Sequence, residues 1–205
     1  MKNTINDDTS DRHRKKYENP SALHQLVLGR FLDLLAKELR GFENANALDF
    51  GCGEAFFWNE MDRRGVNMGN LTGVDLRKDA LEVAGKNFPQ HTFLRQDLLA
   101  WETDDKYDLV IASQVLEHLP GPEKFLNQLC KLTSRQGHLL LTVPWEPFFM
   151  LTNLARGRDI KRLGNHPEHI NHWGKRTFTQ FVATKAKVIK TLAVFPFILV
   201  IAQPV

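Results

Sequence analysis

The stretch "ALDFGCGEAF", residues 47–56, places two glycines and a cysteine directly after a short run that contains an acidic residue, Asp49. Glycine lets the backbone approach a bound ligand closely, and a helix that begins at this point offers free N–H groups to an anion. Such a turn can hold a phosphate, hold a different charged cofactor, or only connect a strand to a helix. These ten residues alone leave the three readings open.

Outward from this stretch, short apolar segments alternate with segments that have the apolar spacing of helices. We expect strands over 46–51, 70–76, 91–98, 107–113 and 137–144, and helices over 21–42, 54–65, 77–89 and 121–133. Strands that alternate with helices of this length predict βαβ units and a parallel sheet with helices on both faces. In such a sheet ligands bind beyond the carboxyl ends of the strands, so the residues that follow each strand are the first candidates for a site.

The later part of the sequence has a different pattern. Residues 145–176 are rich in Trp, His and Arg and show no regular period, and a helix is expected over 175–185. Two apolar runs follow, 188–195 and 197–203, with Pro196 between them. Strands separated by so few residues pair antiparallel, because a parallel pair needs a long crossover. The sequence therefore predicts an antiparallel hairpin at the edge of the parallel sheet.

Length and composition are those of one ordinary globular domain. The chain has 205 residues, of which 42% are apolar and 25% charged, and its net charge of +3 is spread along the sequence. The one basic cluster, "DRHRKKY" at 11–17, belongs to a polar N-terminal arm, residues 1–20. We expect this arm to be solvated, and residues 21–205 to form a single domain.

Three further features bear on the compartment. Cys52 and Cys130 are far apart and match no metal-ligand spacing, which is typical of a protein in a reducing environment. The N-terminus lacks the apolar core of a secretory signal, and the apolar run 192–202 is too short to cross a bilayer. The sequence therefore predicts a cytoplasmic protein.

Asp75, at the end of the second expected strand, narrows the choice of ligand. It lies 22 residues beyond Gly53, and an acid at this distance can accept hydrogen bonds from both hydroxyls of a ribose; a cap on the following helix is the alternative. A dinucleotide fold expects a third glycine where this sequence has Phe56, and Asp49 would repel a pyrophosphate. Asp49 suits a cationic amino group instead, so a cofactor with an amino-acid end and an adenosine end fits: S-adenosylmethionine.

Five successive segments resemble the motifs of class I S-adenosylmethionine-dependent methyltransferases, in the type 11 group that includes the ubiquinone-biosynthesis methyltransferases. The segments are "ALDFGCGEAFF", "LTGVDLRKDALEVA", "FLRQDLLAW", "YDLVIASQVLEHLPGPEKFL" and "GHLLLTVP". The resemblance covers residues 21–145 well and departs at Ala55, where the family most often has a third glycine. It implies a Rossmann-like α/β fold, a three-layer sandwich with a seven-stranded, mostly parallel sheet whose last strand runs antiparallel. Residues 145–176 would then form a lid on the substrate side.

The resemblance also implies cofactor-binding roles at four strand ends. The residues are Asp49, Gly51, Cys52 and Gly53 after the first strand, Asp75 and Leu76 after the second, Asp97 and Leu98 after the third, and Ser113 and Gln114 after the fourth. The first group would line the methionine end, with Cys52 contributing chiefly its backbone. The second would bind the ribose hydroxyls and pack on the adenine, the third would meet the adenine amino group, and the fourth would lie near the sulfonium.

Two histidines are candidates for the general base that an oxygen or nitrogen acceptor can require. His118 follows Glu117 just after the fourth strand, where the alternative is that the pair only shapes the turn into the next helix. His169 lies between His166 and His172 on the lid segment. For each of these three, a structural or solvent-facing role is the alternative.

A narrower resemblance raises the question of a metal. Methyltransferases that modify the 2′-hydroxyl at small-RNA 3′ ends carry an E-x-x-E-H run after strand four and a later histidine before an aromatic residue, which together bind a divalent metal. Here the run reads Gln114 to His118, and the later element is His169 to Trp173. Gln114 removes a charged oxygen ligand, which hard cations prefer. The sequence therefore assigns no metal, and leaves open whether Glu117, His118 and His169 bind one.

Together these features predict an enzyme that transfers a methyl group from S-adenosylmethionine to a small-molecule or lipid-like acceptor and releases S-adenosylhomocysteine. The lid segment mixes apolar and basic residues, which suits an apolar substrate entrance and a peripheral contact with anionic lipid; an ordinary amphipathic lid is the alternative. An RNA 2′-O-methyltransferase is disfavoured because the positive excess is slight and no separate RNA-binding module is recognised. A non-catalytic S-adenosylmethionine-binding protein is the third hypothesis, since a fold does not prove a function. The acceptor and the oligomeric state are not predicted.

Overall fold

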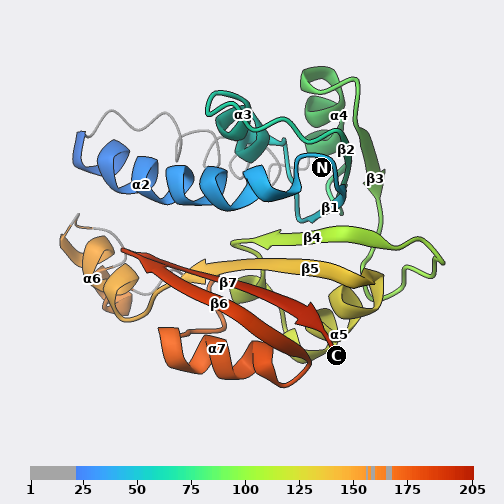
Figure 1. Cartoon of the computed structure of the whole chain (residues 1–205). Helices are drawn as coiled ribbons and strands as arrows, with labels where there is room; N and C mark the ends of the chain where they lie inside the picture. Colours follow the sequence, from blue (N-terminus) through green and yellow to red (C-terminus); the bar gives the residue numbers. More distant parts are fainter. Residues whose placement is uncertain (1–21, 156, 158–159, 165–167) are drawn as a thin grey trace, which may run out of the picture.

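Seven strands form a single sheet in the order β3-β2-β1-β4-β5-β7-β6 (Figure 1). The computed structural model describes residues 22–155, 157, 160–164 and 168–205. The expected N-terminal arm with its basic cluster, and His166, lie outside these residues. The strands are β1 (Asn46–Phe50), β2 (Asn70–Asp75), β3 (Thr92–Arg95), β4 (Tyr107–Ser113), β5 (Thr133–Pro144), β6 (Ala186–Val194) and β7 (Phe197–Pro204).

Helices cover both faces of this sheet (Figure 1). They are α2 (Ala22–Leu39), α3 (Phe56–Asp62), α4 (Lys78–Asn87), α5 (Pro122–Leu132), α6 (Phe148–Ala155) and α7 (Lys175–Ala183), with short 3-10 turns η1 (Arg40–Phe42), η2 (Leu116–His118) and η3 (Ile160–Arg162). Side chains of α2, α3 and α4 share one core cluster, and those of α5 and α7 share the other. Ala47 and Leu48, which are neighbours in β1, belong to opposite clusters, because successive side chains of a strand point to opposite faces. The expected three-layer α/β sandwich is confirmed.

The antiparallel hairpin is also confirmed. β7 runs antiparallel to β5 on one side and to β6 on the other, whereas the pairs among β1 to β5 are parallel. The apolar run 192–202 is divided between β6 and β7, which only Phe195 and Pro196 separate. Among the described residues, no helix combines the length and the apolar character needed to cross a membrane.

Two segments differ from the expectation. The stretch 145–176, expected to be irregular, contains helix α6, whose sequence "FFMLTNLA" is apolar on most of its surface and so lacks the one-sided spacing that reveals a helix. Strand β5 begins at Thr133, four residues before the expected start at Gly137, because Thr133 pairs with Tyr107 ahead of an irregularity in the ladder. Neither difference changes the order of the strands or the position of their carboxyl ends.

Candidate functional site

A left-handed turn follows β1. Gly51, Gly53 and Ala55 have φ angles of 76°, 54° and 60°, a region in which glycine is the least strained residue. The N–H groups of Gly51 and Cys52 both donate to the carbonyl of Val74 in β2, at 2.8 and 3.2 Å. The turn is therefore attached to the carboxyl end of the neighbouring strand. Because Ala55 takes the left-handed conformation at the N-cap position, α3 begins at Phe56, two residues after the expected start at Glu54.

The turn after β1 also touches the turn after β4. A Cβ atom at Gly51 would lie 2.6 Å from Cγ2 of Val115, which is too close for any other residue type without movement of Val115. Gly51 thus needs to be glycine for its space as well as for its φ angle. This close approach brings together the ends of two strands that the sequence marked as cofactor-binding.

Asp75 joins the end of β2 to the same turn. Its Oδ2 accepts a hydrogen bond from the N–H of Gly53 at 3.0 Å, and its Oδ1 accepts one from the N–H of Arg77 at 2.9 Å. The N-cap position of α4 is Arg77, which lies two residues beyond Asp75, so the alternative that Asp75 is the helix cap is wrong. Each carboxylate oxygen has a second acceptor site, which leaves Asp75 capacity to bind further donors at this edge.

The sequence reasoning missed a buried ion pair beside Asp75. Nη1 of Arg77 lies 3.2 Å from Oε1 of Glu54, and its Nε lies 3.7 Å from Oδ1 of Asp75. The guanidinium lies between two carboxylates and offsets the negative charge that they bring to the turn. Nothing in the spacing of Glu54 and Arg77 indicates this contact, because the two residues meet only when β1 and β2 pair.

Asp49 lies in β1, two residues before the turn, and is almost completely buried. Its Oδ2 accepts a hydrogen bond from the indole N–H of Trp58 at 2.8 Å. Burial raises the pKa of Asp49 to about 7; the bond from Trp58 opposes this shift and the nearby charge of Asp75 adds to it. Burial therefore favours the protonated form of Asp49 at neutral pH far more than it would be favoured in an exposed carboxyl. The sequence indicated Asp49 but not Trp58, its partner in α3.

The ends of β2 and β3 carry both exposed apolar side chains and polar groups. Leu76 is 60% exposed and Leu99 is also exposed, whereas the Leu98 side chain lies in the core. Nε of Arg95 donates to the carbonyl of Leu76 at 2.9 Å, which joins the two strand ends. The carboxylate of Asp97 accepts the N–H of Leu99 at 3.0 Å. Because the Leu98 side chain faces inward, Leu98 offers a ligand only its backbone.

Ser113 and Gln114, at the end of β4, share a partner that the sequence did not indicate. Both side chains contact Oγ1 of Thr142 in β5, at 3.0 Å from Ser113 Oγ and 3.2 Å from Gln114 Nε2. Gln114 has a positive φ of 59°, and its N–H donates to the carbonyl of Thr142 at 3.0 Å. These bonds fix the turn that leads into η2.

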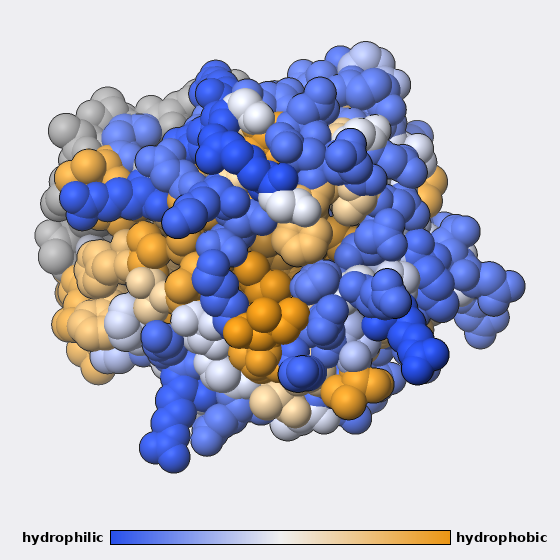
Figure 2. All heavy atoms as spheres, viewed as in Figure 1, coloured by the Kyte–Doolittle hydropathy of each residue, from blue (hydrophilic) through white to orange (hydrophobic). Residues whose placement is uncertain are grey.

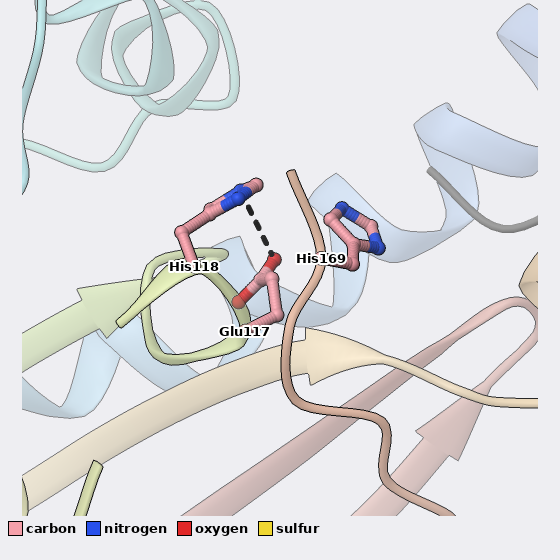
Figure 3. Close-up of side chains that lie close together, drawn as sticks. All are labelled: Glu117, His118 and His169. Atoms are coloured by element: carbon pink, nitrogen blue, oxygen red, sulfur yellow. Dashed lines mark ion pairs between the residues drawn. The ribbon is translucent and has the colours of Figure 1, made fainter. Parts of the chain in front are cut away.

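Three polar side chains come together just beyond this turn (Figure 3). Oε1 of Glu117 lies 4.0 Å from Nε2 of His118, and the rings of His118 and His169 are 4.9 Å apart between centroids. The structure thus joins the two histidines that the sequence proposed separately as bases. Among the described residues His172 does not belong to this cluster.

Backbone hydrogen bonds hold the segment 145–176 against η2. The N–H groups of Ile170 and Asn171 donate to the carbonyl of Glu117, at 2.9 and 3.1 Å. The Asn171 amide donates to the carbonyls of Leu116 and Leu119, at 3.0 and 2.7 Å. Asn171 was not indicated by the sequence, yet its side chain attaches this segment to Leu116 and Leu119, which lie more than fifty positions earlier in the chain.

Comparison with known proteins supports the same family. A family model described as a methyltransferase domain matches residues 20–184. The chain is 32% identical over 117 residues to a ubiquinone biosynthesis O-methyltransferase of Alkalilimnicola ehrlichii, which covers 54% of this chain and 46% of that protein. It is 34% identical over 100 residues to a trans-aconitate 2-methyltransferase of Agrobacterium fabrum, covering 48% of this chain and 38% of the relative. The chain thus spans about half the length, or less, of these curated relatives.

The fold is similar to that of a solved methyltransferase over nearly the whole chain. Magnesium protoporphyrin IX methyltransferase from Synechocystis PCC 6803, solved with bound S-adenosylhomocysteine, superposes with a TM-score of 0.72 at 19% identity and covers 98% of this chain and 96% of that one. At this identity the likeness concerns the fold alone. The family model, by contrast, matches the sequence over residues 20–184, which is most of the chain. The protein therefore belongs to the methyltransferase-domain family, in the class I, Rossmann-like group.

Proposed function

We propose that this protein is an S-adenosylmethionine-dependent methyltransferase that transfers a methyl group to a small-molecule or lipid-like acceptor and releases S-adenosylhomocysteine. One observation carries the proposal: the Asp75 carboxylate and the left-handed Gly51–Gly53 turn are joined by a hydrogen bond at adjacent strand ends. A ribose needs such a carboxylate, and an amino-acid end needs a backbone that it can approach closely.

The residues around this point fit the adenosine end. Asp75 keeps acceptor sites for two ribose hydroxyls in addition to its two backbone donors. Leu76, directly after Asp75, and Leu99, after the third strand, are exposed apolar side chains, and they would cover a flat apolar ring. Asp97 and the backbone of Leu98 would meet the adenine amino group at the next strand end.

The residues after β1 and β4 fit the methionine end. The Asp49 carboxyl would favour the cationic amino group, and Cys52, whose thiol is buried, would contribute backbone. Ser113 and Gln114 are held by Thr142 at the end of β4, close to where the turn after β1 touches Val115. We place the sulfonium there.

Methyl transfer needs in-line approach of the acceptor, and the protein supplies this by positioning and by removing water. S-adenosylmethionine supplies the electrophilic methyl group. His118 and His169 are the candidates for a base that takes the proton of an oxygen or nitrogen acceptor. In His118, Nδ1 lies 2.9 Å from the carbonyl of Glu168, so Nδ1 carries the proton and Nε2 is the basic nitrogen.

An apolar surface on the lid segment supports a small or lipid-like acceptor. Phe148 and Leu151 of α6 are exposed, and Phe148 packs edge-on against Phe195 at 5.8 Å between centroids. Figure 2 shows this side of the molecule, over α6, as largely hydrophobic. The exposed Lys161 and Arg162 of η3 would let the same side meet an anionic lipid surface. We place the protein in the cytoplasm, since both of its cysteines are free thiols.

The test is a calorimetric titration with S-adenosylmethionine, S-adenosylhomocysteine and NAD. We expect the first two to bind and NAD not to bind. Asp75→Ala removes two charge-assisted hydrogen bonds to the ribose, each worth about 1.5–3 kcal/mol, so affinity should fall at least about 100-fold. Asp79→Ala, an exposed carboxylate in the first turn of α4, is the matched control and should bind normally.

Because Asp75 also anchors two backbone N–H groups, Asp75→Asn is the second variant, since it retains one acceptor oxygen. A folded Asp75→Asn protein with wild-type affinity would contradict the proposed role of the carboxylate. Binding of NAD alone would overturn the cofactor assignment. Cofactor binding without turnover of any acceptor class would support the non-catalytic alternative.

A further inference from the structure

We propose that Arg77 is a positioning residue for the cofactor: anchored by Glu54, its guanidinium holds the Asp75 carboxylate in the orientation that recognises the ribose hydroxyls. The inference rests on the proposed function, which assigns the ribose to Asp75. Arg77 occupies the N-cap position of α4, two residues beyond Asp75, whereas Glu54 lies in the turn after β1. The ion pair therefore joins the same two strand ends that the cofactor would contact.

The Asp75 carboxylate is held by both segments. Its Oδ2 accepts the N–H of Gly53 at 3.0 Å, and its Oδ1 accepts the backbone N–H of Arg77 at 2.9 Å. Nε of Arg77 lies 3.7 Å from Oδ1, so the side chain acts there as a charge rather than as a hydrogen-bond donor. The last torsion of an aspartate is soft, and rotation about it would carry Oδ1 away from this charge. The guanidinium thus adds a restraint to the two backbone bonds.

Glu54 fixes the position of the guanidinium. Its side chain is 2% exposed, and its Oε1 accepts a hydrogen bond from Nη1 of Arg77 at 3.2 Å. Its neighbours Gly53 and Ala55 both have positive φ angles, so the main chain on either side of it is a tight turn. Arginine can contact one carboxylate through Nη1 and another through Nε because its donors form a rigid planar fork. The compact ammonium of a lysine offers no such fork.

Stability alone is a poor explanation for this pair. Taking two charges out of water costs free energy that their mutual attraction offsets only in part, and apolar residues of similar volume are often as stabilising. Nη2 of Arg77 is buried and has no hydrogen-bond partner among the residues that the structure describes. An unsatisfied buried donor adds to the cost. This cost points to a role at the neighbouring carboxylate.

The guanidinium keeps its charge in this setting. Burial lowers the pKa of Arg77, but the hydrogen bond and the charge of Glu54 oppose this effect. The charges of Asp75 and Asp79 act in the same direction as Glu54, and together they raise the pKa above its usual value. A permanent cation between Glu54 and Asp75 offsets the repulsion between these two carboxylates. Without the cation, that repulsion would favour other orientations of Asp75.

A positioning role of this kind affects one part of the cofactor only. Asp75 would bind the ribose hydroxyls, whereas the methionine end would contact the turns after β1 and β4. A carboxylate that is less well oriented should therefore lose its preference for a ribose over a deoxyribose. A merely structural ion pair, by contrast, would weaken the binding of both kinds of ligand to the same extent.

The experiment is calorimetry on the full chain with S-adenosylhomocysteine and with its 2′-deoxy and 3′-deoxy analogues. The main variant combines Glu54→Gln with Arg77→Met, which removes both charges and leaves neither one buried without its partner. We expect the wild type to prefer the ribose form, and the variant to reduce this preference roughly 10-fold, the equivalent of one weakened charge-assisted hydrogen bond. The matched control combines Lys78→Met with Glu82→Gln, which removes an exposed ion pair of the same helix, and should bind all three ligands as the wild type does.

Arg77→Lys is the second variant, and thermal unfolding shows which variants are folded. It keeps a positive charge for the buried Glu54, which protects the fold, but a single ammonium cannot replace the fork, so the preference for ribose should fall here too. The inference is overturned if the folded variants keep the wild-type preference, or if all three ligands weaken equally. A wild type that binds none of the ligands, or binds all three equally well, overturns the ribose assignment in the proposed function and this inference with it.

Discussion

Asp49→Asn isolates a buried carboxyl whose ionisation opposes folding at high pH. Burial raises the pKa of Asp49 from 3.8 to about 7 in the folded protein. The folded state therefore binds this proton more tightly than the unfolded state does. Stability from this group is fully present below pH 4, falls as the pH rises toward 7 and is lost above it. A difference of about 3 pKa units corresponds to roughly 4 kcal/mol.

Asparagine remains neutral and keeps an oxygen that can accept the indole N–H of Trp58. Urea unfolding at pH 5, 6, 7 and 8 should show the free energy of unfolding of the variant rising relative to that of the wild type, by about 3 kcal/mol between pH 5 and pH 8. Asp104→Asn, in an exposed loop, controls for the general effect of removing a carboxylate. If the free energy of unfolding of Asp49→Asn and that of the wild type change in parallel with pH, the reasoning is refuted.

The same carboxyl predicts a proton signal on ligand binding. A cationic amino group beside Asp49 would favour its ionised form and lower its pKa. S-adenosylmethionine should then release protons when it binds between pH 6 and 7. Calorimetric heats measured in two buffers of different ionisation enthalpy report this release, and it should disappear in Asp49→Asn.

Three smaller perturbations test other contacts. Gly51→Ala should lower the free energy of unfolding by at least about 1–2 kcal/mol, because position 51 has a positive φ and an added Cβ would collide with Val115. In chemical denaturation, adding Val115→Ala should recover part of this loss. Full stability of the single variant would contradict this account. Asn171→Ala removes two hydrogen bonds, about 2 kcal/mol in total, and should speed limited proteolysis within 145–176. An unchanged cleavage rate would argue against this attachment of the segment to η2. Leu76→Ala should change the free energy of unfolding by less than about 0.5 kcal/mol, yet in calorimetry it should weaken the binding of S-adenosylmethionine roughly 10-fold. Leu151→Ala, at an exposed position on α6, should leave both the stability and the affinity for S-adenosylmethionine unchanged.

The fold was predictable because its signals are local. Buried parallel strands read as short apolar runs, and the two residues between β6 and β7 leave only an antiparallel pairing. Helix α6 was missed because an all-round apolar segment has no period to detect. The early start of β5 was missed because it depends on pairing with Tyr107, which lies 26 positions before Thr133.

The site was predictable only in part. Asp49, Gly51 and Asp75 stand at strand ends, and topology brings strand ends together whatever the intervening residues are. Trp58, Arg77 and Asn171 act through contacts that only the folded chain creates, and no spacing rule marks them. The contact between His118 and His169 depends in the same way on how the segment 145–176 packs against η2, which periodicity does not encode. These contacts set the protonation and the orientation of the site residues that the sequence did predict.

The position of β7 between β5 and β6 has a consequence for synthesis on the ribosome. About 50 residues separate the end of β5 from the start of β7, and at 5–20 residues per second their translation takes roughly 3 to 10 seconds. During that interval β5 presents an open edge, and β6 emerges before the strand that connects it to the sheet. Open edges of this kind are templates for pairing between chains. A nascent chain that has emerged as far as β6 is therefore the species most in need of a chaperone, and codons that slow its elongation would lengthen this exposure.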